Sequence, residues 1–321
     1  MASSDISILG TIVFDIFVKN YSYLPKNGEA VELNVLPFAA GGCGLNSAVA
    51  LSFLGADVSL FGSIGNDFFA KFIIDYLKTF SIDISSVKTS KRFPTSTSIL
   101  LINKKGERSY FHFPGSSKEV SVHDKDLSKI LNSKIFHVGG ITLFPASIIS
   151  SLSKIFNNVR SNNVVTSIDL AWDVENKWMK RIKPILPHTD ILMGNEQEIR
   201  ALTKENKLVK AVKLIHLMGV KNVIVKRGEK GSLVSKDFLL EEIPTIKVKS
   251  FDSTGAGDMF AGGFLYGILK GFSPIDSAKI GNVMGAIATT EFGSTTALRR
   301  IKSKNEVRKL LIKYYDFNYY I

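Results

Sequence analysis

The sequence predicts an α/β fold in which helices cover both faces of a mostly parallel sheet, with a small β-sheet beside it. Two observations support this prediction. From residue 135 onward, short apolar segments alternate with amphipathic helical segments, as in parallel strands joined by crossover helices. Earlier, three segments look like antiparallel strands outside that alternation: Glu29–Phe38, Ser96–Asn103 and Arg108–Phe113. Turn signals such as Lys105-Gly106 and 25–28 join them. With 321 residues, 45% of them apolar, the chain can form one large domain.

The expected elements follow one another with no obvious linker. The expected strands are Ile6–Val18, Glu29–Phe38, Asp57–Phe61, Ser96–Asn103, Arg108–Phe113, Ile135–Val138, Val164–Ile168, Ile191–Met193 and Val223–Lys226. The stretch Ala39–Ala48 should open a first helix that runs to about Leu54 and ends at Gly55. The other expected helices are Phe68–Phe80, Ala146–Arg160, Glu196–Thr203, Leu208–Met218, Ala256–Lys270, Pro274–Thr290 and Lys304–Tyr314. We expect a single domain over 1–321, with a lid formed by about 15–38 and 96–115.

Polar residues follow several of the expected parallel strands. In folds of this class, ligands bind beyond the carboxyl ends of the strands. Asp169 follows one strand, Asn195 to Glu198 follow the next, and Arg227 to Gly231 follow a third. Asn195 and Glu198 are three residues apart at a helix start, which places both on one side of the helix. They also fit a capping box, so a ligand-binding role and a purely structural role both remain open.

The stretch Asp252–Phe264 combines small residues, an acid and the start of an amphipathic helix. The first amides of a helix have no intrahelical partner and the macrodipole is positive there, so such a turn can bind an anion. Asp258, next to that turn, could orient a hydroxyl group and accept its proton. The alternative is structural: Asp252 or Thr254 caps the helix and Asp258 complements its dipole.

A second glycine-rich turn, Gly41 to Gly44, opens the first helix. It does not match a dinucleotide fingerprint, since Ser47 stands where the last glycine is needed and no acid follows the next strand. Paired glycines let a ligand approach the backbone, and Asn46 can both donate and accept, which suits a polyol. Asp15 interrupts an apolar run, so it is either a turn residue or a ligand for hydroxyl groups. Asn46 as a plain surface residue also remains open.

Composition limits the partners. The net charge is +12, but the lysines are scattered and are not gathered with aromatic residues, so we expect no nucleic-acid partner. No apolar stretch is long enough to span a membrane, so we expect no membrane partner. Cys43 is the only cysteine, which excludes a disulfide framework and a cysteine-rich zinc site and favours a cytoplasmic location.

Together these motifs resemble those of the ribokinase family, also called the PfkB carbohydrate kinases. The motifs occur in that family's order and span nearly the whole chain; they are Gly41–Ala48, Leu54–Ala56, Asn195–Glu198, Arg227–Gly231 and Asp252–Asp258. The resemblance implies ATP-dependent phosphoryl transfer to a sugar hydroxyl. It also implies a Rossmann-like three-layer α/β/α core with a small β-sheet lid that often mediates dimerisation, and hence a homodimer.

The resemblance also implies roles for individual residues. Asp258 is the catalytic base, and the amides of Gly255, Ala256 and Gly257 form an anion hole. The implied sugar-binding residues are Asp15, Gly41, Gly42 and Asn46. The implied nucleotide-binding residues are Asn195, Lys226, Gly228 and Asn282, while Glu198 holds Mg²⁺ through water. A potassium site is implied at Asp252, Thr254, Ala288, Glu291 and Gly293, mainly through backbone carbonyls.

Departures from the family pattern bear on the substrate. Lys226 replaces a small hydroxyl residue, and either adds charge to the site or points into solvent. Leu143 lies where ribose-specific members have an acid, and His112 provides no arginine clamp for a carboxylate. A neutral hexose such as fructose, or a related ketose, is therefore favoured. A nucleoside or sugar-phosphate kinase, or a catalytically silent binding protein of the same fold, remains an alternative. Cys43 is expected to be a small packing residue.

Overall fold

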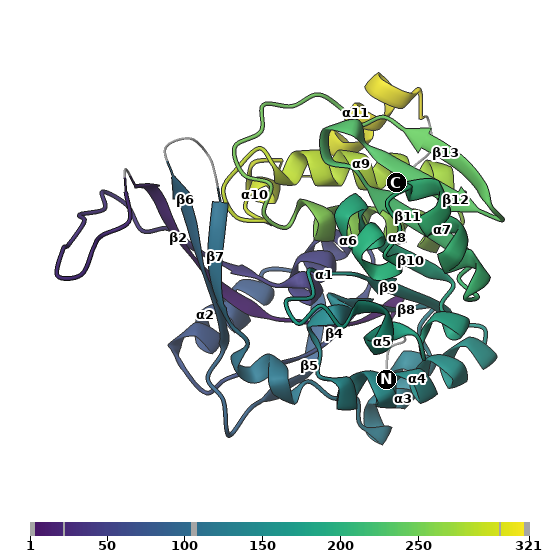
Figure 1. The fold of residues 1–321 in the computed structure, drawn as a ribbon, viewed down its shortest axis with the longest axis horizontal. Coiled ribbons are helices and arrows are strands. Elements are labelled where there is room, and N and C mark those ends of the chain that lie inside the picture. Colours follow the sequence, from purple (N-terminus) through teal and green to yellow (C-terminus); the bar gives the residue numbers. More distant parts are fainter. Residues whose placement is uncertain (1–3, 22, 104–107, 302, 318–321) are drawn as a thin grey trace.

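The computed structural model describes residues 4–21, 23–103, 108–301 and 303–317. Its centre is a nine-stranded sheet in the order β13-β12-β11-β10-β9-β8-β1-β4-β5 (Figure 1). Neighbouring strands from β5 across to β11 are parallel, while β12 and β13 add an antiparallel edge. The strands are β1 (Ile6–Gly10), β4 (Val58–Ile64), β5 (Ile82–Thr89), β8 (Ile135–Gly139), β9 (Val165–Asp169), β10 (Ile191–Asn195), β11 (Asn222–Lys226), β12 (Ser232–Lys236) and β13 (Leu239–Ile243).

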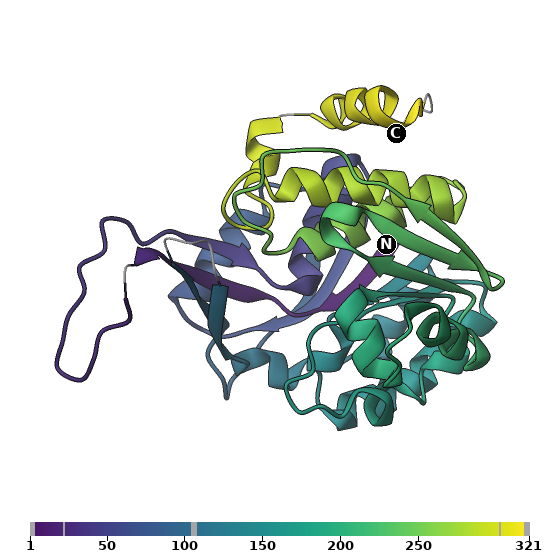
Figure 2. The same cartoon turned by 45° about the horizontal axis from the view of Figure 1, so that its top comes forward.

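Helices cover both faces of this sheet, as expected for parallel strands that are buried on both sides (Figure 2). They are α1 (Cys43–Leu54), α2 (Phe68–Leu77), α3 (Asp124–Leu131), α4 (Ala146–Ser161), α5 (Trp178–Ile182), α6 (Glu196–Thr203), α7 (Leu208–Leu217), α8 (Ala256–Leu269), α9 (Pro274–Ala288), α10 (Ala297–Ile301) and α11 (Lys304–Tyr315). Alternate strand residues enter separate cores. Ile8 of β1 packs in the core of α1, α8 and α9, whereas Leu9 packs in the core of α4 and α7. No described helix is long and apolar enough to cross a bilayer.

A second sheet of four strands lies to one side, in the order β3-β2-β6-β7 (Figure 1). Its strands are β2 (Val13–Tyr21), β3 (Phe38–Gly41), β6 (Ser96–Asn103) and β7 (Arg108–Phe113). β2 and β6 are parallel, and the other two pairs are antiparallel. The large parallel sheet with its helices and the separate small sheet confirm the predicted fold class.

Two expectations about the N-terminal third were wrong. The apolar run from Ile6 is not one strand: it divides into β1 and β2, which belong to different sheets and are separated only by Thr11 and Ile12. Residues 29–37 form no strand, and β3 starts only at Phe38. Both long edges of β2 are already paired, with β3 and β6, so the segment before β3 has no place beside it.

The junction between the two sheets depends on a close backbone approach. A Cβ atom on Gly44 in α1 would lie 2.6 Å from the Cα atom of Gly10 at the end of β1. Only glycine lets the start of α1 come this near to the strand. The same helix ends as predicted, at Gly55 in a left-handed conformation whose N–H bonds the carbonyls of Leu51 and Ser52. α1 is therefore held at both ends, with its N-terminus where β1 passes into β2.

Candidate active site

The turn that precedes α8 is fixed by Asp252. Its Oδ1 accepts hydrogen bonds from the backbone N–H (3.0 Å) and the hydroxyl (2.7 Å) of Thr254. Its Oδ2 accepts from the N–H of Gly293 over 3.2 Å, which ties the turn to the loop after α9. Gly255 has a φ of 70°, and a Cβ there would lie 2.1 Å from the Cβ of Ser294. The tight turn requires glycine, and it presents the amides of the first turn of α8 at the carboxyl-end edge of the sheet.

Asp258 lies in that first turn of α8, and residues of α1 hold it. Asn46 donates from Nδ2 to Oδ2 of Asp258 over 2.8 Å, and the hydroxyl of Ser47 donates to the Asp258 carbonyl over 3.1 Å. The two helices can meet because Gly262 has no side chain: a Cβ there would lie 2.5 Å from the Cβ of Ala50. Burial raises the pKa of Asp258, and the bond from Asn46 and the charge of Lys226 oppose that shift. A raised but opposed pKa suits a carboxylate that must accept a proton.

Cys43 is the first residue of α1. Its side chain packs against Gly139 and Gly140, and its thiol lies close enough to Asp258 for each group to affect the pKa of the other. Burial raises the pKa of this thiol well above its usual value, with the charge of Asp258 as a further cause. A raised pKa makes a thiol a poorer nucleophile, which supports the predicted packing role.

Lys226 does not point into solvent, which excludes one of the two sequence-based alternatives. It is the last residue of β11, and its Nζ bonds both carboxylate oxygens of Asp169, at 2.7 and 2.8 Å, with only 13% of the lysine side chain exposed. A Cβ on Gly257 would lie 3.1 Å from that Nζ. Burial raises the pKa of Asp169 to about 6, and Lys226 opposes the shift. A buried ion pair thus lies directly against the turn of α8.

Asn195 and Glu198 form the predicted capping box at the start of α6. The Asn195 side chain accepts from the Glu198 N–H over 2.8 Å, and Glu198 Oε2 accepts from the Asn195 N–H over 2.7 Å. Burial raises the pKa of Glu198 to about 7, against the charge of Lys226. In the cap, Glu198 bonds through Oε2 only. Among the described residues there is no group of three or more His, Cys, Asp or Glu side chains arranged for a metal.

Asp15 lies in the middle of β2 and is 7% exposed, so it is not a turn residue. A Cβ on Gly41 of the neighbouring strand would lie 2.0 Å from Oδ2 of Asp15, so glycine is needed there to admit the carboxyl group. Burial raises the pKa of Asp15 to about 7, while a hydrogen bond from Ser98 opposes the shift and the charge of Asp258 adds to it. Asp15 is thus close enough to Asp258 for the two charges to interact.

Other expected site residues lie around these groups. Gly42 has a φ of 98°, and a Cβ there would lie 2.5 Å from the Thr11 carbonyl oxygen, so the turn before α1 requires glycine. Gly228 has a φ of 56° with open space where a Cβ would lie. Asn282 of α9 donates from Nδ2 to the carbonyls of Ile243 (3.1 Å) and Pro244 (3.3 Å), so its amide nitrogen secures the chain after β13. A nucleotide-binding role for Gly228 and Asn282 stays a prediction.

Two residues of the site had no role assigned from the sequence. Asp169 stood out only as a polar residue after a strand, and its pairing with Lys226 spans 57 residues. Ser294 is 1% exposed, its hydroxyl has no hydrogen-bond partner among the described residues, and a Cβ on Gly255 would lie 2.2 Å from it. Its position directly after Gly293 was the only sequence signal.

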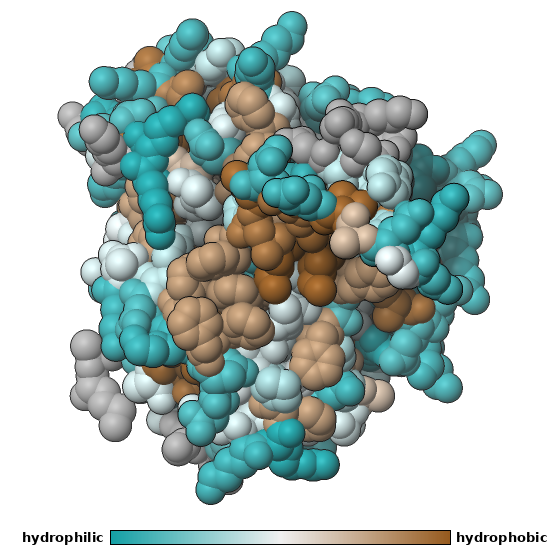
Figure 3. Space-filling view, turned by 90° about the vertical axis from the view of Figure 1, so that its left-hand side faces the viewer, coloured by the Kyte–Doolittle hydropathy of each residue, from teal (hydrophilic) through white to brown (hydrophobic). Residues whose placement is uncertain are grey.

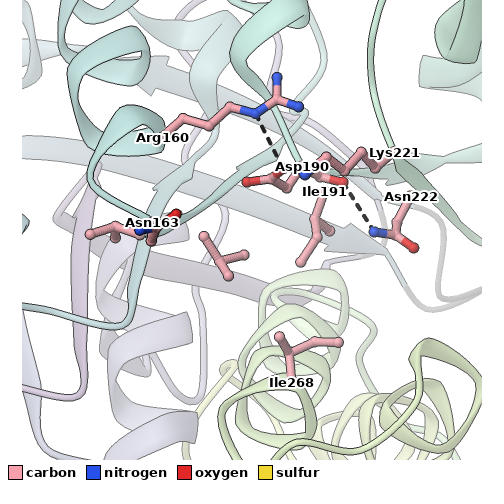
Figure 4. Close-up of a pocket in the computed structure, with 9 residues that line it drawn as sticks. Arg160, Asn163, Asp190, Ile191, Lys221, Asn222 and Ile268 are labelled. Carbon is pink, nitrogen blue, oxygen red and sulfur yellow. Dashed lines mark hydrogen bonds and ion pairs between the residues drawn. The ribbon is translucent and has the colours of Figure 1, made fainter.

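A cavity of about 340 Å³ lies at the opposite edge of the sheet (Figure 4). Its lining comes from the amino ends of β9, β10 and β11. Arg160 and Lys221 both pair with Asp190 there, over 3.5 and 2.8 Å, so the charges of the cavity are engaged with one another. It shares no residue with the site around Asp258.

Comparisons with known proteins agree with the motifs. Residues 3–300 match the model of the "pfkB family carbohydrate kinase". The chain is 28% identical to "Probable fructokinase-5" of Arabidopsis thaliana, covering 81% of this chain and 85% of that protein. It is also 28% identical to "Fructokinase-2" of Oryza sativa subsp. japonica, covering 84% of each. Among solved structures, Arabidopsis thaliana ribokinase complexed with ribose and ATP has the same fold, with a TM-score of 0.82 and 24% identity over 97% of this chain and 99% of that one.

Proposed function

The chain belongs to the pfkB family of carbohydrate kinases and is an ATP-dependent sugar kinase, and we propose that Asp258 is the general base of its reaction. One observation carries this proposal. The carboxylate of Asp258 is held by Asn46 over 2.8 Å, beside the turn at the N-terminus of α8. A base and a positive helix end thus lie together at the edge where doubly wound sheets bind ligands.

In the proposed reaction a sugar hydroxyl oxygen attacks the γ-phosphorus of ATP. The new O–P bond forms as the bond to the β-phosphate oxygen breaks, the hydroxyl proton passes to Asp258, and ADP leaves. The protein does little covalent work in such a step, so its rate comes from alignment and from positive potential around the transferred group. The amides of Gly255, Ala256 and Gly257 supply that potential in this proposal.

The acceptor sugar would lie between the small sheet and α1. Asn46 is 2% exposed, and its Oδ1 has no hydrogen-bond partner among the described residues, which suits a hydroxyl donor from the sugar. Asp15 offers a second acceptor. Gly41 makes room for its carboxyl group and Gly42 for the Thr11 carbonyl, and both glycines belong to the proposed sugar site. On the same face as Asp15, His112 bonds Ser98 over 3.1 Å and supplies no fixed cation. We favour a neutral ketose, and the two fructokinase relatives support fructose.

The proposed cofactor is Mg²⁺, bound with ATP. Mg²⁺ commonly binds through one or two carboxylates, several waters and substrate phosphates, and it neutralises charge on the transferred group. Glu198 fits such a site through water, because it is buried at the carboxyl-end edge near Lys226 and Asp169. Asn195, Lys226, Gly228 and Asn282 are the proposed nucleotide-binding residues.

We also retain the potassium site as part of this proposal. Asp252 joins the turn before α8 to the loop after α9 through Thr254 and Gly293. A monovalent cation between these loops, bound by Asp252 and by carbonyls of Thr254, Ala288, Glu291 and Gly293, would help to hold the anion-binding turn in place.

A cytoplasmic location stays a prediction from the cysteine count.

The small sheet is proposed to be both a lid over the sugar and a dimer interface. Strand register places Phe38, Ile99, Phe111 and Phe113 on the face opposite Asp15. These four side chains are 52%, 38%, 68% and 47% exposed, and apolar side chains gather on this side of the molecule (Figure 3). Apolar area of this kind marks an interaction surface. A second copy of the chain, pairing face to face, would cover it in a homodimer.

The experiment that tests the proposed function is ADP release from MgATP over a panel of acceptors. The panel contains neutral ketoses and aldoses, sugar phosphates and nucleosides, each with and without potassium. We expect turnover with a neutral ketose at the highest kcat/KM, and stimulation by potassium. A clear preference for a nucleoside or a sugar phosphate would refute the acceptor assignment. If none of the acceptors supports turnover, and circular dichroism shows that the protein is folded, the proposed function is refuted.

A further inference from the structure

We propose that Lys226 is a catalytic residue whose ammonium group contacts the transferred phosphoryl group, and that Asp169 is the positioning residue that holds it there. This inference rests on the proposed function, since it concerns the same site. Lys226 was named above only as a nucleotide-binding residue, with no part in the transfer step. Its ammonium group forms a buried ion pair with Asp169 at the edge of the sheet where the ligands are expected.

The geometry of Lys226 limits what its ammonium group can reach. An ammonium has three N–H donors, and in the described part of the chain its hydrogen bonds go to Asp169 alone. The two carboxylate oxygens occupy at most two donors. The Nζ atom also lies 3.1 Å from where a Cβ of Gly257 would be, so the open side of that glycine faces the ammonium. A phosphoryl group received at the turn of α8 would therefore meet Lys226 directly.

The charges around Lys226 have one sign. Burial alone would lower the pKa of Lys226. The negative charges of Asp169, Glu198 and Asp258 nevertheless keep this pKa above its usual value. The other titratable neighbours are the His137 imidazole, whose pKa burial lowers to about 3, and the protonated Cys43 thiol, so neither adds charge. Lys226 is thus the positive group within a cluster of carboxylates. An incoming phosphate would be repelled by the carboxylates without it.

A structural role does not account for this pair. Burying two charges costs several kcal/mol per ion, and replacing a buried pair by neutral groups of similar size is often neutral or stabilising. A charged pair beside the anion-binding turn therefore calls for a functional reason. During transfer Lys226 forms and breaks no covalent bond; it donates to an oxygen of the moving phosphoryl group as negative charge redistributes.

The test separates folding from chemistry with three variants: Lys226→Met, Asp169→Asn, and the two combined. Lys226→Met leaves Asp169 buried without its partner, so we expect a lower melting temperature. Combining it with Asp169→Asn removes both charges, so we expect the melting temperature to recover. If Lys226 is catalytic, kcat falls about 100-fold in Lys226→Met, the loss expected for one transition-state donor, and does not recover in the double variant. Recovery of both properties together would show a purely structural pair.

A binding measurement gives a readout that does not depend on turnover. Because the proposed contact is to the γ-phosphoryl group, calorimetry with MgATP and with MgADP should show that Lys226→Met weakens ATP about tenfold more than ADP, the effect of about 1.4 kcal/mol expected for a charge-assisted hydrogen bond. Lys221→Met, at the opposite edge of the sheet, is the matched control and should leave the ATP-to-ADP ratio unchanged. An unchanged ratio in Lys226→Met would overturn this inference while leaving the proposed kinase function intact. Absence of turnover in the wild type would instead overturn the proposed function, and the binding ratio would still test Lys226.

Discussion

Asn46 and Asp258 are 212 residues apart in the chain, yet Nδ2 of Asn46 lies 2.8 Å from Oδ2 of Asp258. The contact joins α1 to α8, which pack closely because Gly262 has no side chain. It leaves Oδ1 of Asn46 without a hydrogen-bond partner among the described residues. One amide can therefore orient the proposed base with its nitrogen and a sugar hydroxyl with its oxygen.

Replacing Asp258 by Asn should lower kcat by a factor of at least about 100, the low end of the effect expected for the loss of a general base. ATP binding should be largely retained, because the amides of the α8 turn remain. Steady-state kinetics and calorimetry with MgATP measure the two effects. Asp75→Asn, at an exposed pair with Lys71, is the control and should keep normal turnover. Near-normal kcat in Asp258→Asn would remove Asp258 from the mechanism.

Replacing Asn46 by Ala should change the pH dependence of the reaction. The hydrogen bond from Asn46 lowers the pKa of Asp258 against the effect of burial. Without it the carboxyl group holds its proton to higher pH, so the acidic limb of the kcat/KM profile should move upward. The KM for the sugar should also rise, because Oδ1 is lost. Serine at position 47 bonds only the backbone of Asp258, so Ser47→Ala should leave the limb in place. An unmoved limb in Asn46→Ala would contradict this account.

A negative charge on the exposed face of the small sheet should prevent dimerisation. Phe111 is 68% exposed on β7, the edge strand of the apolar face, so Phe111→Glu would place an unpaired charge in the proposed interface. Sedimentation velocity should show a dimer for the wild type and a monomer for the variant. Val174→Glu, at a site that is 80% exposed and outside this sheet, should remain dimeric. A monomeric wild type at micromolar concentration would refute the interface.

Burial of Asp15 should make stability fall as the pH rises. Its pKa is about 7 in the folded chain and near 4 when unfolded, so the folded state binds the extra proton. Its contribution is therefore fully present below pH 4 and is lost as the pH rises through about 7. Asp15→Asn should reduce the decrease in the free energy of unfolding between pH 5 and pH 8 by up to about 2.6 kcal/mol, the part of the pKa shift that falls in this pH range.

The measurement for Asp15 is urea unfolding at several pH values. Asp75→Asn is again the control, because Lys71 holds the pKa of Asp75 below its usual value and the residue stays ionised over this range. Burial also raises the pKa values of Asp169 and Glu198. Part of the decrease in unfolding free energy with rising pH should therefore persist in Asp15→Asn. An identical slope in both proteins would mean that Asp15 is not desolvated in solution.

The sequence predicted the family, the alternation of strands and helices, and the capping box at Asn195, because each depends on neighbouring residues. It did not predict the strands β5, β12 and β13, whose mixed composition resembles loops. Glu29–Phe38 has the alternation of a strand but no free strand beside which to pair, and pairing is decided by the whole sheet. The contact of Lys226 with Asp169 has the same origin, since it depends on which strands become neighbours.

The strands of the small sheet come from two separate segments of the chain, each of which follows a strand of the large sheet. β2 follows β1 after two residues, β3 leads directly into α1, and β6 and β7 return after β5. The small sheet is therefore not one contiguous insertion in the sequence. Transplanting it between relatives to exchange substrate preference therefore requires two simultaneous segment swaps, one of β2 with β3 and one of β6 with β7, each with its own junctions to the core.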